Sequence, residues 1–247
     1  MISHLQIASL LEDAHAPLAN THRAGVYLTN ALTGWVPERH PQSLLFEEFR
    51  REREDSENIK QHGTILVILG NPPYNGYAGI AKIEEERDLT NAYRAPVAGL
   101  PAPQGQGLND LYIRFFRIAE RRIAQNEDGQ GIVCFISNYS WLDGLSHPTM
   151  RHHYLRTFDQ IYVDNLHGDR KISEYAPDGQ TSETVFAVAG SSPGIRIGTA
   201  ITALVRKSER RPQVGQFAIA TSKMPALQSG VSLFCSRCKH TDLPIQS

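Results

Sequence analysis

ILVILGNPPY, residues 65–74, places an apolar run directly before a turn that contains two prolines. The run at 65–70 has no alternation of apolar and polar residues, a pattern typical of a central strand buried on both faces. Proline fixes its own φ and keeps the preceding residue out of the helical region, so Asn71 and Pro72 are expected to be extended. Ligands in open α/β sheets bind just beyond the carboxyl ends of strands. The stretch therefore predicts an α/β fold whose strand delivers Asn71 to a site.

The turn has the chemistry to hold an amine. Pro72 and Pro73 lack N–H groups, so the turn offers carbonyl acceptors without competing donors, and the Asn71 amide oxygen adds another. An aromatic amine such as adenine N6 is a poor nucleophile because its lone pair is delocalised into the ring. If the Asn71 oxygen and the Pro72 carbonyl accept both amine protons, the nitrogen can pyramidalise and turn its lone pair toward an electrophilic methyl. Tyr74 would stack on the base, an interaction worth about 1–3 kcal/mol.

These features predict methylation of an amino group in nucleic acid. The other interpretation is an ordinary turn at the end of a strand, because Asn-Pro and Pro-Pro pairs are common in loops. The strand before the turn and the ordered segments after it favour the functional interpretation.

GNPPY, residues 70–74, matches motif IV of the N6-adenine DNA methyltransferases. Over roughly residues 1–207 the chain resembles the methyltransferase portion of the fused restriction–modification enzymes called type ISP. The segments that carry this resemblance are residues 27–32, 71–79, 108–116, 131–142 and 161–168.

The resemblance implies a Rossmann-like sheet of the S-adenosylmethionine-dependent methyltransferases. It implies methyl transfer from S-adenosylmethionine to adenine N6 of DNA in a restriction–modification system. The residues that match the family's catalytic motif are Asn71, Pro72, Pro73 and Tyr74.

Enzymes of this family carry a glycine-rich loop after their first strand, and nothing before Asn71 fits that pattern. Gly105 and Gly107 lie in a proline-rich loop with no strand ahead of it, so they fail the contextual test. We therefore expect a sheet truncated on its N-terminal side, with 1–207 as a partial catalytic domain. The cofactor-binding residues stay unknown, and a separate cofactor-binding or target-recognition segment is an expected partner besides DNA.

Residues 208–247 form a divergent, poorly ordered tail in this interpretation. The tail contains Cys235 and Cys238, which look like half of a zinc site. Structural zinc needs four ligands, and no second pair follows, so the sequence favours two ordinary thiols and no metal. Cys134 lies in an apolar run, where a buried reduced thiol is expected.

The composition is that of a globular protein, with 247 residues, 40% of them hydrophobic and 21% charged. A formal net charge of −1 gives no overall basic surface, so DNA contacts must come from a local surface or from another part of a larger protein. No apolar stretch approaches the roughly twenty residues of a membrane span, and no signal pattern opens the chain. The sequence thus predicts a cytoplasmic location and no membrane partner.

Other segments have simpler patterns. The first residues indicate a short helix, and the alternating charges within 39–62 indicate a solvated helix face. Glycines and prolines predict an extended loop over 75–107. The family resemblance makes four of its residues candidates for DNA contact by position, although solvated loop residues are the alternative favoured for each: Tyr77, Lys82, Tyr93 and Arg94.

Residues 108–123 have the spacing of an amphipathic helix, with Asn109 as its N-cap. Its aromatic stripe, Tyr112, Phe115 and Phe116, is predicted to be core and not a base-stacking platform. Further strands are predicted at residues 131–136, 161–166, 185–189 and 195–205, the last two joined by a hairpin turn at 190–194. The polar loop at 137–140 either lines the base or cofactor pocket or forms a capped turn.

Two other functions remain open on sequence grounds. The chain could be a non-catalytic remnant that binds nucleic acid or a partner chain, which the missing glycine loop favours. The same turn chemistry also suits an adenine in RNA or a glutamine amide in protein.

Overall fold

A computed structural model describes residues 2–19, 25–36, 46–74, 83–124, 129–169, 175, 197–207 and 216–221. The chain divides into two compact units, Met1–Thr64 and Ile65–Ser247. The second unit begins at the apolar run that precedes the proline turn. The expected division after residue 207 stays a prediction. Within the described ranges, no helix has the length and apolar character needed to cross a membrane.

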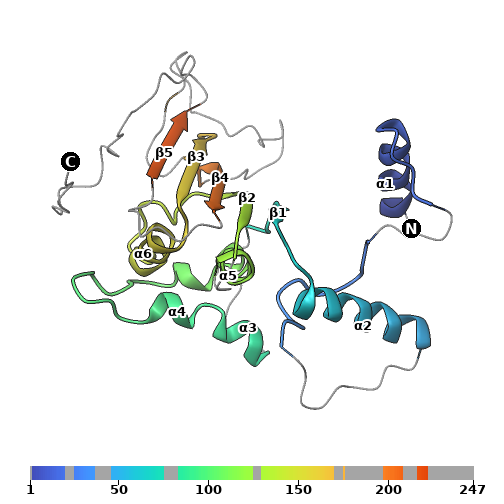
Figure 1. The fold of residues 1–247 in the computed structure, drawn as a ribbon. Coiled ribbons are helices and arrows are strands. Elements are labelled where there is room, and N and C mark those ends of the chain that lie inside the picture. Colours follow the sequence, from blue (N-terminus) through green and yellow to red (C-terminus); the bar gives the residue numbers. More distant parts are fainter. Residues whose placement is uncertain are drawn as a thin grey trace. The chain divides into compact units, whose positions relative to one another are not determined.

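The first unit contains helix α1 (Ile2–Asp13) and helix α2 (Glu47–His62) (Figure 1). The predicted charged helix is α2. Along its exposed side, Arg50 forms ion pairs with Glu47 at 2.5 Å and with Glu54 at 2.9 Å. One cation of α2 is buried. Lys60 Nζ donates to Thr29 Oγ1 at 2.6 Å and to the Asn30 and Thr33 carbonyls at 2.8 and 2.9 Å. Lys60 therefore fastens the turn at 29–33 to the helix.

The second unit is built on a mixed sheet of five described strands in the order β1-β2-β4-β3-β5 (Figure 1). The strands are β1 (Val67–Gly70), β2 (Gly131–Asn138), β3 (Gln160–Asn165), β4 (Thr199–Arg206) and β5 (Gln216–Thr221). β1 runs parallel to β2, and β3 parallel to β5, while β4 lies antiparallel between β2 and β3. The predicted strands at 131–136, 161–166 and 195–205 are thus present. The strand at 185–189 and the turn at 190–194 lie outside the described residues.

The predicted loop over 75–107 contains two short helices, α3 (Glu84–Asp88) and α4 (Asn91–Arg94). A 3₁₀ turn, η1 (Gly107–Asn109), then leads into α5 (Leu111–Ala124). The N-cap prediction for Asn109 is wrong, because this residue closes the 3₁₀ turn and its Oδ1 accepts from Arg94 Nη2 at 2.6 Å. Helix α6 (Pro148–Thr157) completes the second unit.

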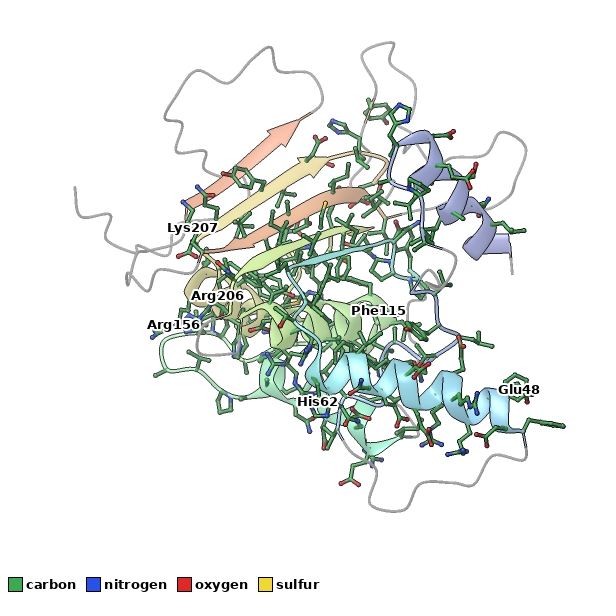
Figure 2. All side chains as sticks on the ribbon, turned by 45° about the vertical axis from the view of Figure 1, so that its right-hand side comes forward. Glu48, His62, Phe115, Arg156, Arg206 and Lys207 are labelled. Atoms are coloured by element: carbon green, nitrogen blue, oxygen red, sulfur yellow. The ribbon has the colours of Figure 1, made fainter. Side chains whose placement is uncertain are left out.

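The aromatic residues of α5 form the core, as predicted. Tyr112 and Phe116 are buried, and Phe115 packs against the same cluster. Figure 2 shows Phe115 on α5, beneath the strands of the sheet. The Phe116 ring centroid lies 5.0 Å from that of Phe135 on β2 and 5.9 Å from that of Trp141. This edge-on aromatic packing joins helix and sheet.

Tyr93 is fully buried, so the solvated-loop interpretation is wrong for this residue. Its hydroxyl donates to buried Glu120 Oε2 at 2.6 Å, and Arg117 Nη1 reaches the same oxygen at 2.8 Å. Burial acts to raise the pKa of Glu120, but hydrogen bonding to His153 and the Arg117 charge outweigh it, and the pKa lies below its ordinary value. An ionised carboxylate thus ties α4 and α6 to α5.

The two faces of the sheet differ sharply. Side chains alternate along each strand, and most of those on the face toward α5 are buried: Val133, Phe135, Ser137, Ile161, Val163, Ala200, Thr202 and Leu204. On the other face Ile132 and Tyr162 are 40% and 45% exposed. Cys134 also lies on that face and is only half-buried, so its predicted burial is wrong.

The prediction of a central strand at 65–70 is wrong. β1 is an edge strand of the described sheet, and Val67 and Leu69 are 54% and 72% exposed. The absence of alternation correctly indicated two apolar faces. Only the face of Ile68 meets the described core.

We expect stability to depend on pH through His147, which is buried beside α6. Burial, together with the nearby Arg151 cation, lowers the pKa of His147 to about 4. A histidine whose pKa falls on folding contributes its full stability above the unfolded pKa of about 6.5 and loses it as the pH falls toward 4. The loss amounts to about 3 kcal/mol. Between pH 7 and pH 4, denaturant unfolding should show that the unfolding free energy of the wild type falls by about 3 kcal/mol more than that of His147→Asn. Equal falls in the two proteins would contradict the expectation.

Candidate functional site

The carboxyl ends of four described strands, β1, β2, β3 and β5, lie on one side of the sheet. β1 ends at Gly70 beside Phe135 of β2, and the end of β2, Asn138, pairs with Thr199 at the start of β4. Ala200 in turn pairs with Asn165, the end of β3. This side of the sheet, at the carboxyl ends of those strands, therefore carries the turn at 71–74 and the segments 138–140, 166–169 and 197–199.

The four predicted catalytic residues follow β1 directly. Asn71 and Pro73 are exposed, Pro72 is buried and Tyr74 is half-buried. The Tyr74 hydroxyl lies 2.6 Å from Asn71 Oδ1 and 3.2 Å from the Ile136 carbonyl oxygen. Burial raises the pKa of Tyr74, so the hydroxyl keeps its proton and acts as a donor. The turn is thereby held against the backbone of β2.

The Asn71 amide oxygen keeps capacity for a ligand. An amide oxygen has two lone pairs, and the Tyr74 hydroxyl uses one of them. The second can accept an N–H from solvent or substrate. Tyr74 was predicted to stack on a base, and its hydroxyl contact with Asn71 is an additional role that the sequence did not indicate.

The loop after β2 is a capped turn. Asn138 Oδ1 accepts from the Ser140 backbone N–H at 2.7 Å and from the Ser140 hydroxyl at 2.5 Å. The Ser137 hydroxyl donates to the Asn138 carbonyl at 3.0 Å. These bonds hold the side chains of Ser137, Asn138 and Ser140 within the loop, which favours the turn interpretation over a direct role in a pocket.

Sequence reasoning missed a contact on the same side of the sheet. The Tyr139 hydroxyl donates to Asp169 Oδ2 at 3.2 Å, and the Tyr139 backbone N–H donates to the Gly198 carbonyl at 3.1 Å. A Cβ at Gly198 would lie 2.0 Å from the Tyr139 ring, so any other residue there would have to displace that ring. His167, between β3 and Asp169, has a φ of 61°, an uncommon conformation that concentrates in turns and functional sites.

Gly107 has a packing role, whereas Gly105 has a φ of 73° and no close contact. A Cβ at Gly107 would lie 2.8 Å from Ser146 Oγ. The same oxygen accepts a hydrogen bond from the Gly107 backbone N–H at 3.2 Å. This supports the conclusion that the pair is no cofactor loop. In the described parts of 1–70, no glycine-rich loop follows a strand. The cofactor-binding residues therefore stay unknown.

Other candidates have different outcomes. Arg94 is exposed and donates to Asn109, while Tyr77, Lys82, Cys235 and Cys238 lie outside the described residues. No group of three or more metal-ligating side chains occurs within the described ranges.

No protein-family model and no curated protein matches the sequence. Solved structures do. LlaBIII, an ATP-dependent type ISP restriction–modification enzyme bound to DNA, matches 88% of this chain at 25% identity and a TM-score of 0.62, over 13% of its own chain.

Two further structures share the fold. A nuclease-deletion mutant of the type ISP enzyme LlaGI, in complex with a DNA substrate mimic, matches 90% of the chain at 20% identity and a TM-score of 0.63, over 17% of its own chain. The DrdV–DNA complex matches 90% at 23% identity and a TM-score of 0.62, over 20% of its own chain. The chain thus resembles part of the type ISP enzymes and spans at most a fifth of these structures.

Proposed function

We propose that the second unit is the adenine-accepting half of an N6-adenine DNA methyltransferase of a restriction–modification system. One observation carries the proposal: the exposed Asn71 amide oxygen stands at the carboxyl end of β1, within a turn whose two prolines have no N–H donors. The likeness to type ISP restriction–modification enzymes supports it.

The turn activates the amine by accepting hydrogen bonds from its two N–H groups. Asn71 Oδ1 accepts one N6–H hydrogen bond on its second lone pair, and the Pro72 carbonyl accepts the other. Pro73 fixes the turn, and the Tyr74 ring stacks on the base. S-adenosylmethionine, when bound, supplies an electrophilic methyl group. No side chain of the turn needs to act as a strong base, because the amine proton can leave after methylation.

DNA is the proposed substrate, and the residues that would choose between DNA and RNA are not identified. Positioning two reactants near contact can lower an activation barrier by about 7–11 kcal/mol, and here the two reactants are the methyl donor and N6. The described residues hold only N6. The cofactor must therefore be held by residues outside the described ranges or by another segment.

Product analysis tests the proposal. The full chain is incubated with DNA and labelled S-adenosylmethionine, alone and together with LlaBIII from which the matched region has been deleted. Mass spectrometry of the digested DNA should find label in N6-methyladenine. Label in cytosine or in protein, or no methyladenine in either arrangement, would overturn it. An excess of RNA should not compete.

We expect Tyr74→Phe to slow methylation by about tenfold, because it keeps the stacking ring and removes the one bond that holds Asn71 Oδ1. The KM for DNA should change little, because stacking is preserved. Initial rates at varied DNA concentration separate the two quantities. An unchanged kcat would show that the hydroxyl has no positioning role.

A further inference from the structure

Arg206 joins several elements at the end of the sheet opposite the proline turn. It pairs with Gly131 at the start of β2, whereas the turn follows the carboxyl end of β1, which runs parallel to β2. Arg206 Nε donates to the Gly129 carbonyl at 2.9 Å, and Nη1 donates to the Thr157 carbonyl at the end of α6 at 2.9 Å. A Cβ at Gly131 would lie 2.9 Å from Ile123 Cδ1, so the last turn of α5 reaches the same place. The ends of α5, α6 and β4 therefore meet there.

These ends carry a group of cations, which we call the basic cluster: Arg121 and Arg122 of α5, Arg156 of α6, and Arg206 and Lys207 where β4 ends. Figure 2 shows Arg156, Arg206 and Lys207 at the same end of the strands. In the sequence, the stretches 121–128, 156–159 and 206–211 hold seven basic and four acidic residues, although the whole chain has a formal net charge of −1. Positive charge is thus concentrated in these segments.

Three cations of the basic cluster have no carboxylate partner within the described ranges: Arg121, Arg156 and Lys207. By contrast, Arg53 pairs with Glu57 at 2.8 Å, and Arg117 pairs with Glu120 at 2.8 Å. Arg156 and Lys207 are exposed, so an anion from outside the chain can reach them.

Two pKa values respond to the positive charge of the basic cluster. Burial, together with the Arg121 charge, lowers the pKa of Arg122. Burial also lowers the pKa of His152 on α6, and the charges of Arg156 and His153 lower it further. The contributions of the neighbouring cations mean that another positive charge is unfavourable at both helix ends. A bound anion would remove this repulsion.

The helix ends explain part of the arrangement. Arg121, Arg122 and Arg156 lie in the last turns of α5 and α6, where cations interact favourably with the helix dipole. The C-terminus of a helix is equivalent to roughly half a negative charge, so two helix ends supply about one negative charge against the five cations of the basic cluster. The cluster therefore keeps a net positive charge that a polyanion can neutralise.

We infer that the basic cluster binds the phosphate backbone of duplex DNA, as a contact surface separate from the proline turn. Arginine suits this partner because its guanidinium can donate two parallel hydrogen bonds to one phosphate. At a rise of about 3.3 Å per residue, the strand from Gly131 to Asn138 spans roughly 23 Å. The cluster is therefore too far from the turn to contact the base held there, and its binding does not depend on DNA sequence.

The surroundings of the basic cluster favour a nucleic-acid duplex over other polyanions. Protein interfaces have an apolar centre, but Leu155, at 39%, is the only exposed large apolar side chain in the described last turns of α5 and α6 and the end of β4. Single strands stack their bases on aromatic rings, and none is exposed in those segments. DNA and RNA duplexes share the phosphate backbone, and the choice of DNA rests on the proposed function.

Fluorescence anisotropy of a labelled DNA duplex of arbitrary sequence measures binding of the full chain without S-adenosylmethionine. We expect Arg156→Glu and Lys207→Glu each to weaken binding by about fivefold or more, and to reduce the slope of log affinity against log salt by about one. Arg51→Glu is the matched control, because it makes the same change of charge at an α2 arginine whose side chain is 74% exposed, and it should leave both quantities unchanged. Lys207 lies outside the helices, so its variant tests the inference even if Arg156→Glu unfolds.

Four results would overturn the inference: no binding of the DNA duplex by the wild type, an equal effect of Arg51→Glu, tighter binding of an RNA duplex, or equal displacement by poly-L-glutamate, which would make an acidic polypeptide the partner. If the two cluster variants lose DNA binding while the wild type forms no methyladenine, the inference stands and the proposed function fails. If the wild type methylates DNA and both variants keep its KM for DNA, the proposed function stands and the inference fails.

Discussion

Asn71→Ala is expected to abolish methylation and leave the fold intact. The substitution removes the acceptor that holds one N6 proton, so the nitrogen cannot present its lone pair. Loss of one positioned hydrogen-bonding group in an active site costs about 10²–10³ in rate. We expect a fall of at least 100-fold in kcat, measured as the initial rate of label transfer to DNA.

Stability should not change much in this variant. The Asn71 side chain is exposed, and among the described residues it contacts the Tyr74 hydroxyl, which has the Ile136 carbonyl as a second acceptor. Exposed substitutions of this kind usually alter the unfolding free energy by less than about 0.5 kcal/mol. Asn71→Asp is the matched control, because it keeps an acceptor oxygen at the same place and should retain more activity than alanine. Full activity of Asn71→Ala would refute the assignment.

The sequence predicted the position of the proline turn better than its surroundings. The proline turn at 71–74 was placed correctly at the carboxyl end of a strand, because backbone restrictions on proline act locally. The location of β1 at the edge could not be read locally. A run of apolar residues indicates that both faces are apolar, but the number of neighbouring strands depends on the rest of the fold.

Tertiary contacts also decided the errors at Tyr93 and Asn109. Tyr93 lies in a segment rich in loop-forming residues, yet Glu120 and Arg117 provide a buried polar partner that holds it in the core. Asn109 has good N-cap chemistry, but Arg94 already occupies its side-chain oxygen. In the same way, the Tyr139–Asp169 contact joins residues thirty positions apart, and no local pattern indicates it.

Gly131→Ala is expected to have the largest effect on stability. Gly131 opens β2 with a φ of 146°, and a Cβ there would lie 2.2 Å from the Leu66 carbonyl oxygen. That oxygen accepts the Ile132 N–H at 2.8 Å, the bond with which β1 and β2 begin to pair. An alanine at this position would have to adopt a strained φ, and its Cβ would meet a backbone atom that cannot move without breaking the strand pairing.

We expect Gly131→Ala to lower the unfolding free energy by about 2–4 kcal/mol, since strained backbone alone costs about 1–3 kcal/mol and the clash adds to it. Gly99→Ala separates the two contributions: Gly99 has a φ of 81°, but a Cβ there meets nothing within 4 Å. Its cost should be about 1 kcal/mol. Denaturant unfolding of both variants measures the difference. Equal losses would show that the Leu66 carbonyl moves aside freely.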